Sequence, residues 1–317
     1  MKKILVLALA FVFAFAGLAA AQDFVSLATG GTGGTYYPIG GGIADIVSKN
    51  VEGLQMTAET GNASVANLNL IGTNQIEMAL VQNDVAFFAH NGEMMFDEPY
   101  KNVRAIATLY PETIQVVAMK KSGVETIHDL PGKRVSVGAP GSGVLADVQL
   151  IFRVLDFKFS DMDTDFLDFN NTADRMKDGQ LDVGFVVAGW PTAAIMDLAT
   201  RHDITLVDFD ESFIDDLNSQ YPFFTKDIVP AGTYTGVDKD TVTTAVQAMW
   251  VCDAGLSEDA VYKITKAFWK NVEDLYQVHS KGKLVTIETA LDGVSVPVHP
   301  GAAKYYREIG LEVPEIE

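Results

Sequence analysis

The sequence predicts an α/β fold in two lobes with mostly parallel sheet, and three observations support this prediction. Short apolar runs alternate with helical patterns from residue 24 onward, as they do in α/β proteins. The composition breaks near residues 116–133, where a second series of the same kind begins. The chain then passes through residues 221–234, which show neither a helical nor a strand period and resemble a return linker. We therefore expect two crossovers and a cleft between the lobes.

The predicted strands are residues 24–28, 54–58, 78–81, 103–109, 135–137, 166–169, 183–187, 204–207 and 242–251. The first strand leads to a helix in which Ile39, Ile43 and Val47 recur at helical spacing, so that one stripe faces the sheet. The last strand leads to a helix whose start is marked by Ser257 and the acidic residues after it. We place lobe 1 at residues 22–115 plus 225–317 and lobe 2 at residues 116–224.

The N-terminus has the features of a secretory signal peptide. Lys2 and Lys3 precede an apolar run over residues 4–16, and alanines at 19–21 supply the small-residue cleavage pattern. We predict that residues 1–21 are cleaved before Gln22 and that the mature protein is free in the periplasm. The apolar run is shorter than the roughly 20 residues of a membrane-spanning helix, so we do not expect the protein to be membrane-inserted.

Charge and composition exclude several classes of function. The formal net charge is −19, and so acidic a chain repels the phosphates of nucleic acids and of anionic membranes. Cys252 is the single cysteine, and the five histidines lack the spacing of metal-binding motifs. We therefore expect no nucleic-acid partner, no metal site and no cofactor.

The most informative segment is the glycine-rich run from Thr29 to Pro38, between the first strand and the first helix. Glycines let a ligand approach the backbone, and a helix N-terminus offers unpaired N–H groups with partial positive charge. The candidate ligand-binding residues here are Gly31, Thr32, Gly33, Thr35 and Tyr36. Three more glycines at 40–42 fall inside the helix, where either tight packing on the sheet or a nearby ligand would account for them.

Three further loops share this design, in which an apolar strand ends in small or polar residues that open a helix. Because ligands of open α/β sheets bind at the carboxyl ends of the strands, we expect all four loops to face one crevice. Ordinary helix capping is the alternative for any single loop. The candidates in these loops are Gln82, Asn83, Gly141, Ser142, Gly143, Val144, Gly189, Trp190 and Pro191. The four loops contain no Lys or Arg, so a bound carboxylate would be held by backbone N–H groups and hydroxyls.

Catalytic and nucleotide-binding motifs do not fit these loops. The glycine loop lacks the Gly-Lys-Ser/Thr ending of a P-loop, and Tyr36 stands where a G-x-G-x-x-G motif requires glycine. Residues 141–143 do not form the G-x-S-x-G turn that presents a nucleophile. With no convincing nucleophile, we expect that the protein is not an enzyme.

Several segments, taken in order, resemble the solute-binding proteins of TRAP transporters, of the TAXI type, over essentially the whole mature chain. These segments are residues 31–38, 79–86, 109–112, 133–143, 229–234 and 298–302. The resemblance implies a two-lobed periplasmic-binding-protein fold, a clamshell that captures an anionic solute as a monomer and delivers it to the membrane subunits of an ion-coupled TRAP permease. Similar members bind glutamate, glutamine or related dicarboxylates. The chain departs from the pattern at Val144, where Thr is expected, and at Trp190, where smaller residues are frequent.

Tyr110 and Glu112 are further candidates for the site. They follow the predicted strand 103–109 that leads out of lobe 1, and they point to the same face if strand geometry continues through Pro111. Glu112 would pair with the ammonium group of an amino-acid ligand, or it would accept backbone N–H bonds that order the crossover. Two other functions are alternatives to transport. The protein could present its ligand-bound form to a sensor kinase, or it could be a periplasmic enzyme on the same fold.

Overall fold

The computed structural model describes residues 23–61 and 63–316. The predicted signal peptide, residues 1–21, and its cleavage before Gln22 lie outside these residues. Strands and helices alternate along the chain, which confirms the predicted α/β class. Within the described residues, none of the helices combines the length and the apolarity that crossing a bilayer requires.

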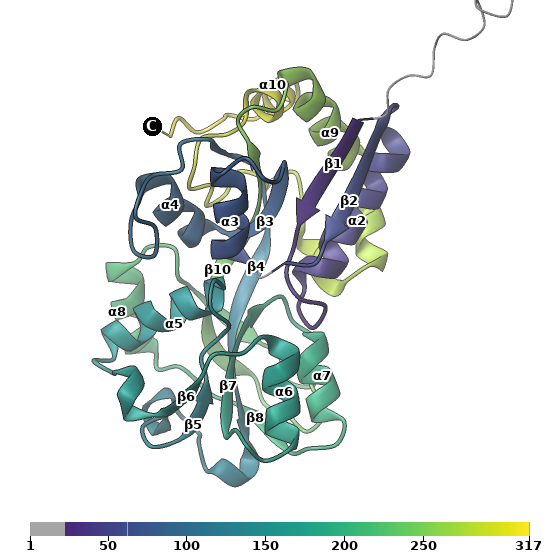
Figure 1. Ribbon diagram of the computed structural model, residues 1–317. Coiled ribbons are helices and arrows are strands. Elements are labelled where there is room, and N and C mark those ends of the chain that lie inside the picture. The colour runs from purple at the N-terminus through teal and green to yellow at the C-terminus, as the bar shows by residue number, and fades with distance from the viewer. Residues whose placement is uncertain (1–22, 62, 317) are drawn as a thin grey trace, which may run out of the picture.

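Three parallel strands form one part of the sheet, which we call the β1 half. Strand β1 (Asp23–Ala28) lies between β2 (Leu54–Glu59) and β3 (Met78–Gln82). Each strand is followed by a helix, namely α2 (Tyr36–Asn50), α3 (Ser64–Gly72) and α4 (Asn83–Asn91). The C-terminal helices α9 (Glu258–Lys270) and α10 (Pro300–Glu308) complete this half (Figure 1). Ser257 caps α9 as predicted, since its hydroxyl accepts from Ala260 N at 3.1 Å.

A second parallel group, the β7 half, contains β5 (Arg134–Ser136) between β6 (Asp163–Asp165) and β7 (Val183–Ala188). Its helices are α5 (Gly143–Val154), α6 (Phe169–Lys177), α7 (Ala193–Ala199) and α8 (Glu211–Gln220). They surround the lower strands in Figure 1. Two short strands, β8 (Ile204–Leu206) and β9 (Thr225–Val229), lie beside this group.

Two long strands join the halves into one sheet. Strand β4 (Val103–Met119) runs antiparallel to β10 (Thr241–Asp253), and their register shifts at two places, between Gln247 and Met249 and between Trp250 and Val251. The sheet order is β2-β1-β3-β10-β4-β7-β5-β6, with β8 paired to β4 and β9 to β10. Pairing is therefore parallel within each half, as predicted, and antiparallel wherever β4 or β10 takes part.

Three local predictions differ from the structure. The strand predicted at 103–109 continues to Met119, because the polar Glu112 is accommodated inside the sheet. Residues 166–169 are not a strand: Leu167 and Phe169 line the cavity described below, Phe169 is the first residue of α6, and Phe166 is exposed. The segment predicted as a linker contains β9, which pairs with β10 in register Thr225 opposite Ala245.

The core consists of three clusters of buried side chains. The first extends through both halves with α3, α4, α5 and α8, the second lies in the β1 half with α2, α9 and α10, and the third lies around β7 and α7. Trp250 packs edge-on against Phe268, with ring centroids 5.3 Å apart. A second aromatic pair is also joined by a hydrogen bond, because Trp269 Nε1 donates to the Tyr306 hydroxyl at 2.9 Å. The cluster around β7 also contains three residues from the C-terminal side of the chain, namely Val229, Tyr234 and Val237.

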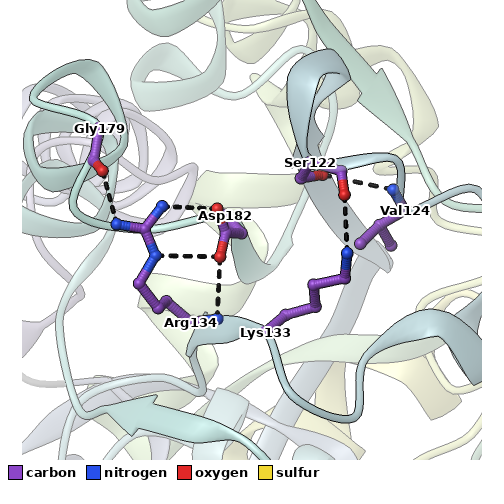
Figure 2. A network of polar contacts seen from close by, with 6 residues as sticks. All are labelled: Ser122, Val124, Lys133, Arg134, Gly179 and Asp182. Atoms are coloured by element: carbon purple, nitrogen blue, oxygen red, sulfur yellow. Dashed lines mark hydrogen bonds and ion pairs between the residues drawn. The ribbon is translucent and has the colours of Figure 1, made fainter.

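A polar network fixes β5 beside the turn that precedes β7 (Figure 2). The Arg134 guanidinium donates to both carboxylate oxygens of Asp182, at 2.6 and 3.0 Å, and to Gly179 O at 2.6 Å. The adjacent Lys133 Nζ donates to Ser122 O at 2.7 Å. The bond to Arg134 lowers the pKa of Asp182. The network therefore anchors the strand that leads into residues 137–144, which contribute to the cavity.

Candidate functional site

A cavity of about 370 Å³ lies where the strand ends of the two halves meet. Its volume falls within the range of small-molecule sites. It is lined by Gly30, Gly31, Thr32, Gly33, Gly34, Thr35, Tyr36, Thr60, Gly61, Ala63, Ser64, Gln82, Glu112, Ala139, Ser142, Gly143, Val144, Leu167, Asp168, Phe169, Asn170, Asn171, Val187 and Ala188. All four predicted loops therefore reach one crevice, the loop after β7 only through Val187 and Ala188, together with Glu112 from β4.

Four helices begin at this cavity. The first residues of α2, α3, α5 and α6, namely Tyr36, Ser64, Gly143 and Phe169, all belong to its lining. Each N-terminus brings N–H groups without intrahelical acceptors and the positive end of a helix dipole. Among the described lining residues there is no Lys or Arg, so these backbone groups are the main source of positive potential.

Two glycines of the cavity, Gly33 and Gly143, lie where the two halves approach closely. A Cβ at Gly33 would overlap the Asn170 amide oxygen, and a Cβ at Gly143 would overlap Gln82 Oε1. Inside α2, a Cβ at Gly40 would overlap Thr29, and one at Gly42 would lie about 2.5 Å from Leu275 Cδ2. Of the two explanations left open by the sequence, tight packing therefore accounts for these two helical glycines.

Glu112 is buried on the floor of the cavity, where it accepts a hydrogen bond from the Tyr36 hydroxyl. Burial raises the pKa of the Glu112 carboxyl to about 8, although the bond from Tyr36 favours the ionised form. The carboxyl is consequently protonated over most of the neutral range. The sequence left open that Glu112 accepts backbone N–H bonds that order the crossover. In the structure its donor is instead the side-chain hydroxyl of Tyr36 from α2.

Behind this floor, an acidic pair links the two halves. Gln82 Nε2, at the end of β3, donates to Asp147 Oδ2 on α5 at 2.7 Å. The Asp147 carboxyl also lies against that of Asp84, and both side chains are buried. Burial, followed by the charge of Asp84, raises the pKa of Asp147 well above its ordinary value. The Gln82 side chain is therefore engaged in this link between the halves.

Six predicted site residues do not line the cavity. The Asn83 amide holds neighbouring backbone, accepting from Gln247 N and donating to Gly293 O, both at 3.0 Å. Asn83 is also the first residue of α4, while Gln82 occupies the cap position without a capping side-chain bond. Tyr110 is buried beside Gly189. The remaining members of this set are Gly141, Gly189, Trp190 and Pro191.

These outlying residues instead connect the halves around the cavity. Thr35 Oγ1 donates to Gly189 O at 2.7 Å, and Ala66 N donates to Gly141 O at 2.9 Å. The ring of Trp190 lies under Lys281 Nζ, 3.8 Å from the ring centroid, and Pro191 O lies 3.1 Å from His279 Nε2. The cavity is therefore enclosed by contacts that any opening of the two halves would have to break.

The sequence interpretation missed two segments of the lining. Residues 60–61 and 63–64 follow β2, and Ala63 has a positive φ of 64°, which is uncommon outside glycine. Residues 167–171 lead into α6, where Asp168 accepts from Asn171 N at 2.9 Å as the N-cap. An acidic residue directly before a helix is a recognisable signal, and it would have added a fifth loop to the site.

Comparisons with known proteins agree with this architecture. A family model described as NMT1-like family matches residues 27–310. A solved structure of a periplasmic transporter has 13% identity and a TM-score of 0.53, covering 92% of this chain and 94% of that one. PhnD1 from Prochlorococcus marinus (MIT 9301), solved with methylphosphonate, has 12% identity and a TM-score of 0.53, with 91% and 97% covered. A putative L-cystine ABC transporter from Listeria monocytogenes has 13% identity and a TM-score of 0.51, with 84% and 98% covered. These likenesses show the two-lobed periplasmic-binding-protein fold.

Proposed function

The chain belongs to the NMT1-like family, and from this premise we propose that it is an exported, non-enzymatic solute-binding protein. It captures a small carboxylate-bearing solute in the cavity between the two halves of the sheet. Capture takes place in the periplasm after removal of residues 1–21. The lobes that close on the solute are proposed to be residues 22–115 plus 225–317 and residues 116–224.

One observation carries this proposal. Four helix N-termini meet at an enclosed cavity that has no cationic side chain in its described lining. Helix N-termini bind anions through their unpaired N–H groups and their dipoles. Because the Glu112 carboxyl is protonated near neutral pH, it does not repel a carboxylate and can donate a hydrogen bond to it. Methylphosphonate, present in the Prochlorococcus structure, is likewise a small anion.

The resemblance to the TAXI type supplies the finer part of the proposal. The protein delivers its cargo to an ion-coupled permease of the TRAP type, and the cargo belongs to the amino acids and related carboxylates, glutamate and dicarboxylates included. Four of the resembling segments, residues 31–38, 79–86, 109–112 and 133–143, contribute to the cavity lining.

Native mass spectrometry of protein purified without added ligand tests whether a small molecule co-purifies. A thermal-shift panel of amino acids, monocarboxylates and dicarboxylates then tests which solutes bind. A ligand at a hundred times its dissociation constant stabilises the folded state by about 2.7 kcal/mol. A protein that carries no small molecule and shows no shift with any member of the panel would disprove the proposal. Adjacent genes for membrane subunits would support delivery to a permease.

A further inference from the structure

Two buried carboxyl groups lie against each other across the boundary between the halves. Asp84 lies on α4 in the β1 half, and Asp147 lies on α5 in the β7 half. Neither side chain is exposed. Residues beside them on both helices, Val85 and Val148 among them, belong to the apolar cluster that extends through both halves. The pair is therefore a polar contact inside an apolar part of the interface, and Gln82 Nε2 is bonded to it.

This pair has fewer hydrogen-bond donors than its oxygens require. Both oxygens of Asp84 and Oδ1 of Asp147 accept no hydrogen bond of normal geometry from the described residues. Across residues 23–61 and 63–316, no Lys or Arg forms an ion pair with either carboxyl. Two ionised carboxylates in such a place repel each other, whereas a proton between them supplies the missing donor.

Separation of the halves would change the affinity of the pair for this proton. In the arrangement described, burial raises the pKa of both carboxyls, and the charge of Asp84 raises the pKa of Asp147 further. Once water reaches the two groups, each pKa returns toward its ordinary value of 3.8. Between the ordinary and the raised values, the closed form therefore holds a proton that the open form has released. The closed form loses this advantage as pH rises through the raised values.

The titratable groups around the pair include one further buried carboxyl. The charge of Glu112 on β4 reaches Asp147, and Glu112 is bonded in turn to the Tyr36 hydroxyl of α2. Burial also raises the pKa of Glu112, so its titration has to be removed from any test. The next titratable side chains on α4 and α5 are His90 and Arg153, each nearly two helical turns further along.

We propose that closure of the two halves takes up a proton at the Asp84–Asp147 pair, which makes the clamshell a pH-sensitive device. Closure is favoured at acidic pH and opening at alkaline pH. The effect belongs to the empty protein and does not depend on the identity of the cargo. One linked proton changes the ratio of closed to open molecules by up to about tenfold per pH unit.

Small-angle X-ray scattering from pH 5.5 to pH 8.5, fitted as a mixture of closed and open molecules, measures this ratio. The mature protein is first shown to be free of solute by native mass spectrometry. The starting variant is Glu112→Gln, which removes the other buried carboxyl, and its closed-to-open ratio should fall at least tenfold over this range. In the triple variant Glu112→Gln/Asp84→Asn/Asp147→Asn, amides replace the ionisable groups of the pair, and the ratio should change less than threefold.

The matched control is Glu112→Gln/Asp215→Asn/Asp216→Asn, because these two aspartates are exposed on α8. Its ratio should follow that of Glu112→Gln. If the triple variant of the pair does not fold, Glu112→Gln/Asp147→Asn replaces it, and the fall should be at most half as large on a logarithmic scale. A constant ratio in Glu112→Gln, or an equal fall with and without the aspartate pair, would overturn the inference and leave solute capture intact.

Discussion

Replacing Glu112 by Gln should change how the stability of the empty protein depends on pH. The carboxyl has its pKa raised from an ordinary value of 4.5 to about 8 by burial. Between these two values the folded state keeps a proton that the unfolded chain has released. The unfolding free energy therefore falls as pH rises through this window, by about 1.4 kcal/mol per pH unit for this one group.

Glu112→Gln keeps the size and the acceptor for the Tyr36 hydroxyl but removes the ionisation. Asp84 and Asp147 titrate in both proteins, so the difference between variant and wild type reports the ionisation of Glu112 together with its charge coupling to these two carboxyls. The variant should gain as much as about 4 kcal/mol relative to wild type between pH 5 and pH 8.

Urea unfolding followed by far-UV circular dichroism at each pH measures this difference. Glu93→Gln is the control, because Glu93 is exposed, and it should follow the wild-type curve. Parallel pH profiles for Glu112→Gln and wild type would refute the conclusion that Glu112 is held protonated in the folded protein.

The same variant separates the two roles that the sequence left open for Glu112. A protonated carboxyl and a neutral amide both donate and accept hydrogen bonds. We expect Glu112→Gln to change the affinities of glutamate and of glutarate, the matching dicarboxylate without the amine, by less than threefold each at pH 7. A large loss confined to glutamate would indicate that an ionised Glu112 pairs with the ammonium group.

Three other substitutions give separate readouts. Gly143→Ala places a Cβ on Gln82 Oε1, so it should destabilise the protein by about 1–3 kcal/mol in urea unfolding, and unchanged stability would contradict this close approach. Ser142→Ala removes the cap of Leu145 N and should lower stability by about 1 kcal/mol without changing ligand affinity in calorimetry; weaker binding at unchanged stability would instead assign Ser142 to the ligand. Burial lowers the pKa of Lys281 to about 8, so the folded protein loses this proton at a lower pH than the unfolded chain. The unfolding free energy of wild type should therefore rise from pH 8 to pH 10 relative to that of Lys281→Met. The same dependence on pH in both proteins would contradict a lowered pKa for this amine.

Much of the fold was predictable because its signals are local. The apolar stripe of α2 and the cap at Ser257 are read from residues three or four apart, and both are present in the structure. The length of β4 was not predictable, because Pro111 and Glu112 interrupt the apolar pattern while the strand continues with β10 as its partner. Strand β9 was missed for a similar reason: most of its side chains are exposed and polar, so its pairing depends on β10 and not on its own sequence.

The candidate site was likewise predictable only where its signals are local in the sequence. Strand-end loops after β1, β3 and β5 were found from their glycines and small polar residues, and they lie at the cavity. The position of Gly189 and Trp190 outside it was not predictable, since it depends on contacts with Thr35 and Lys281, far away in the sequence. The apolar character of residues 167–169 was visible, but a short apolar run does not distinguish a strand from the wall of a cavity.

The continuity of β4 and β10 limits how the cavity can open. Both connections between the halves are neighbouring strands of one hydrogen-bonded ladder, so the halves cannot rotate freely about a flexible tether. Any opening has to bend this ladder, and the two register shifts between Gln247 and Val251 are places where its pairing is already irregular. A single bending motion also means that closure brings the same atoms together each time. The contacts of Thr35 with Gly189 and of Gly33 with Asn170 would then form in the same arrangement at every closure.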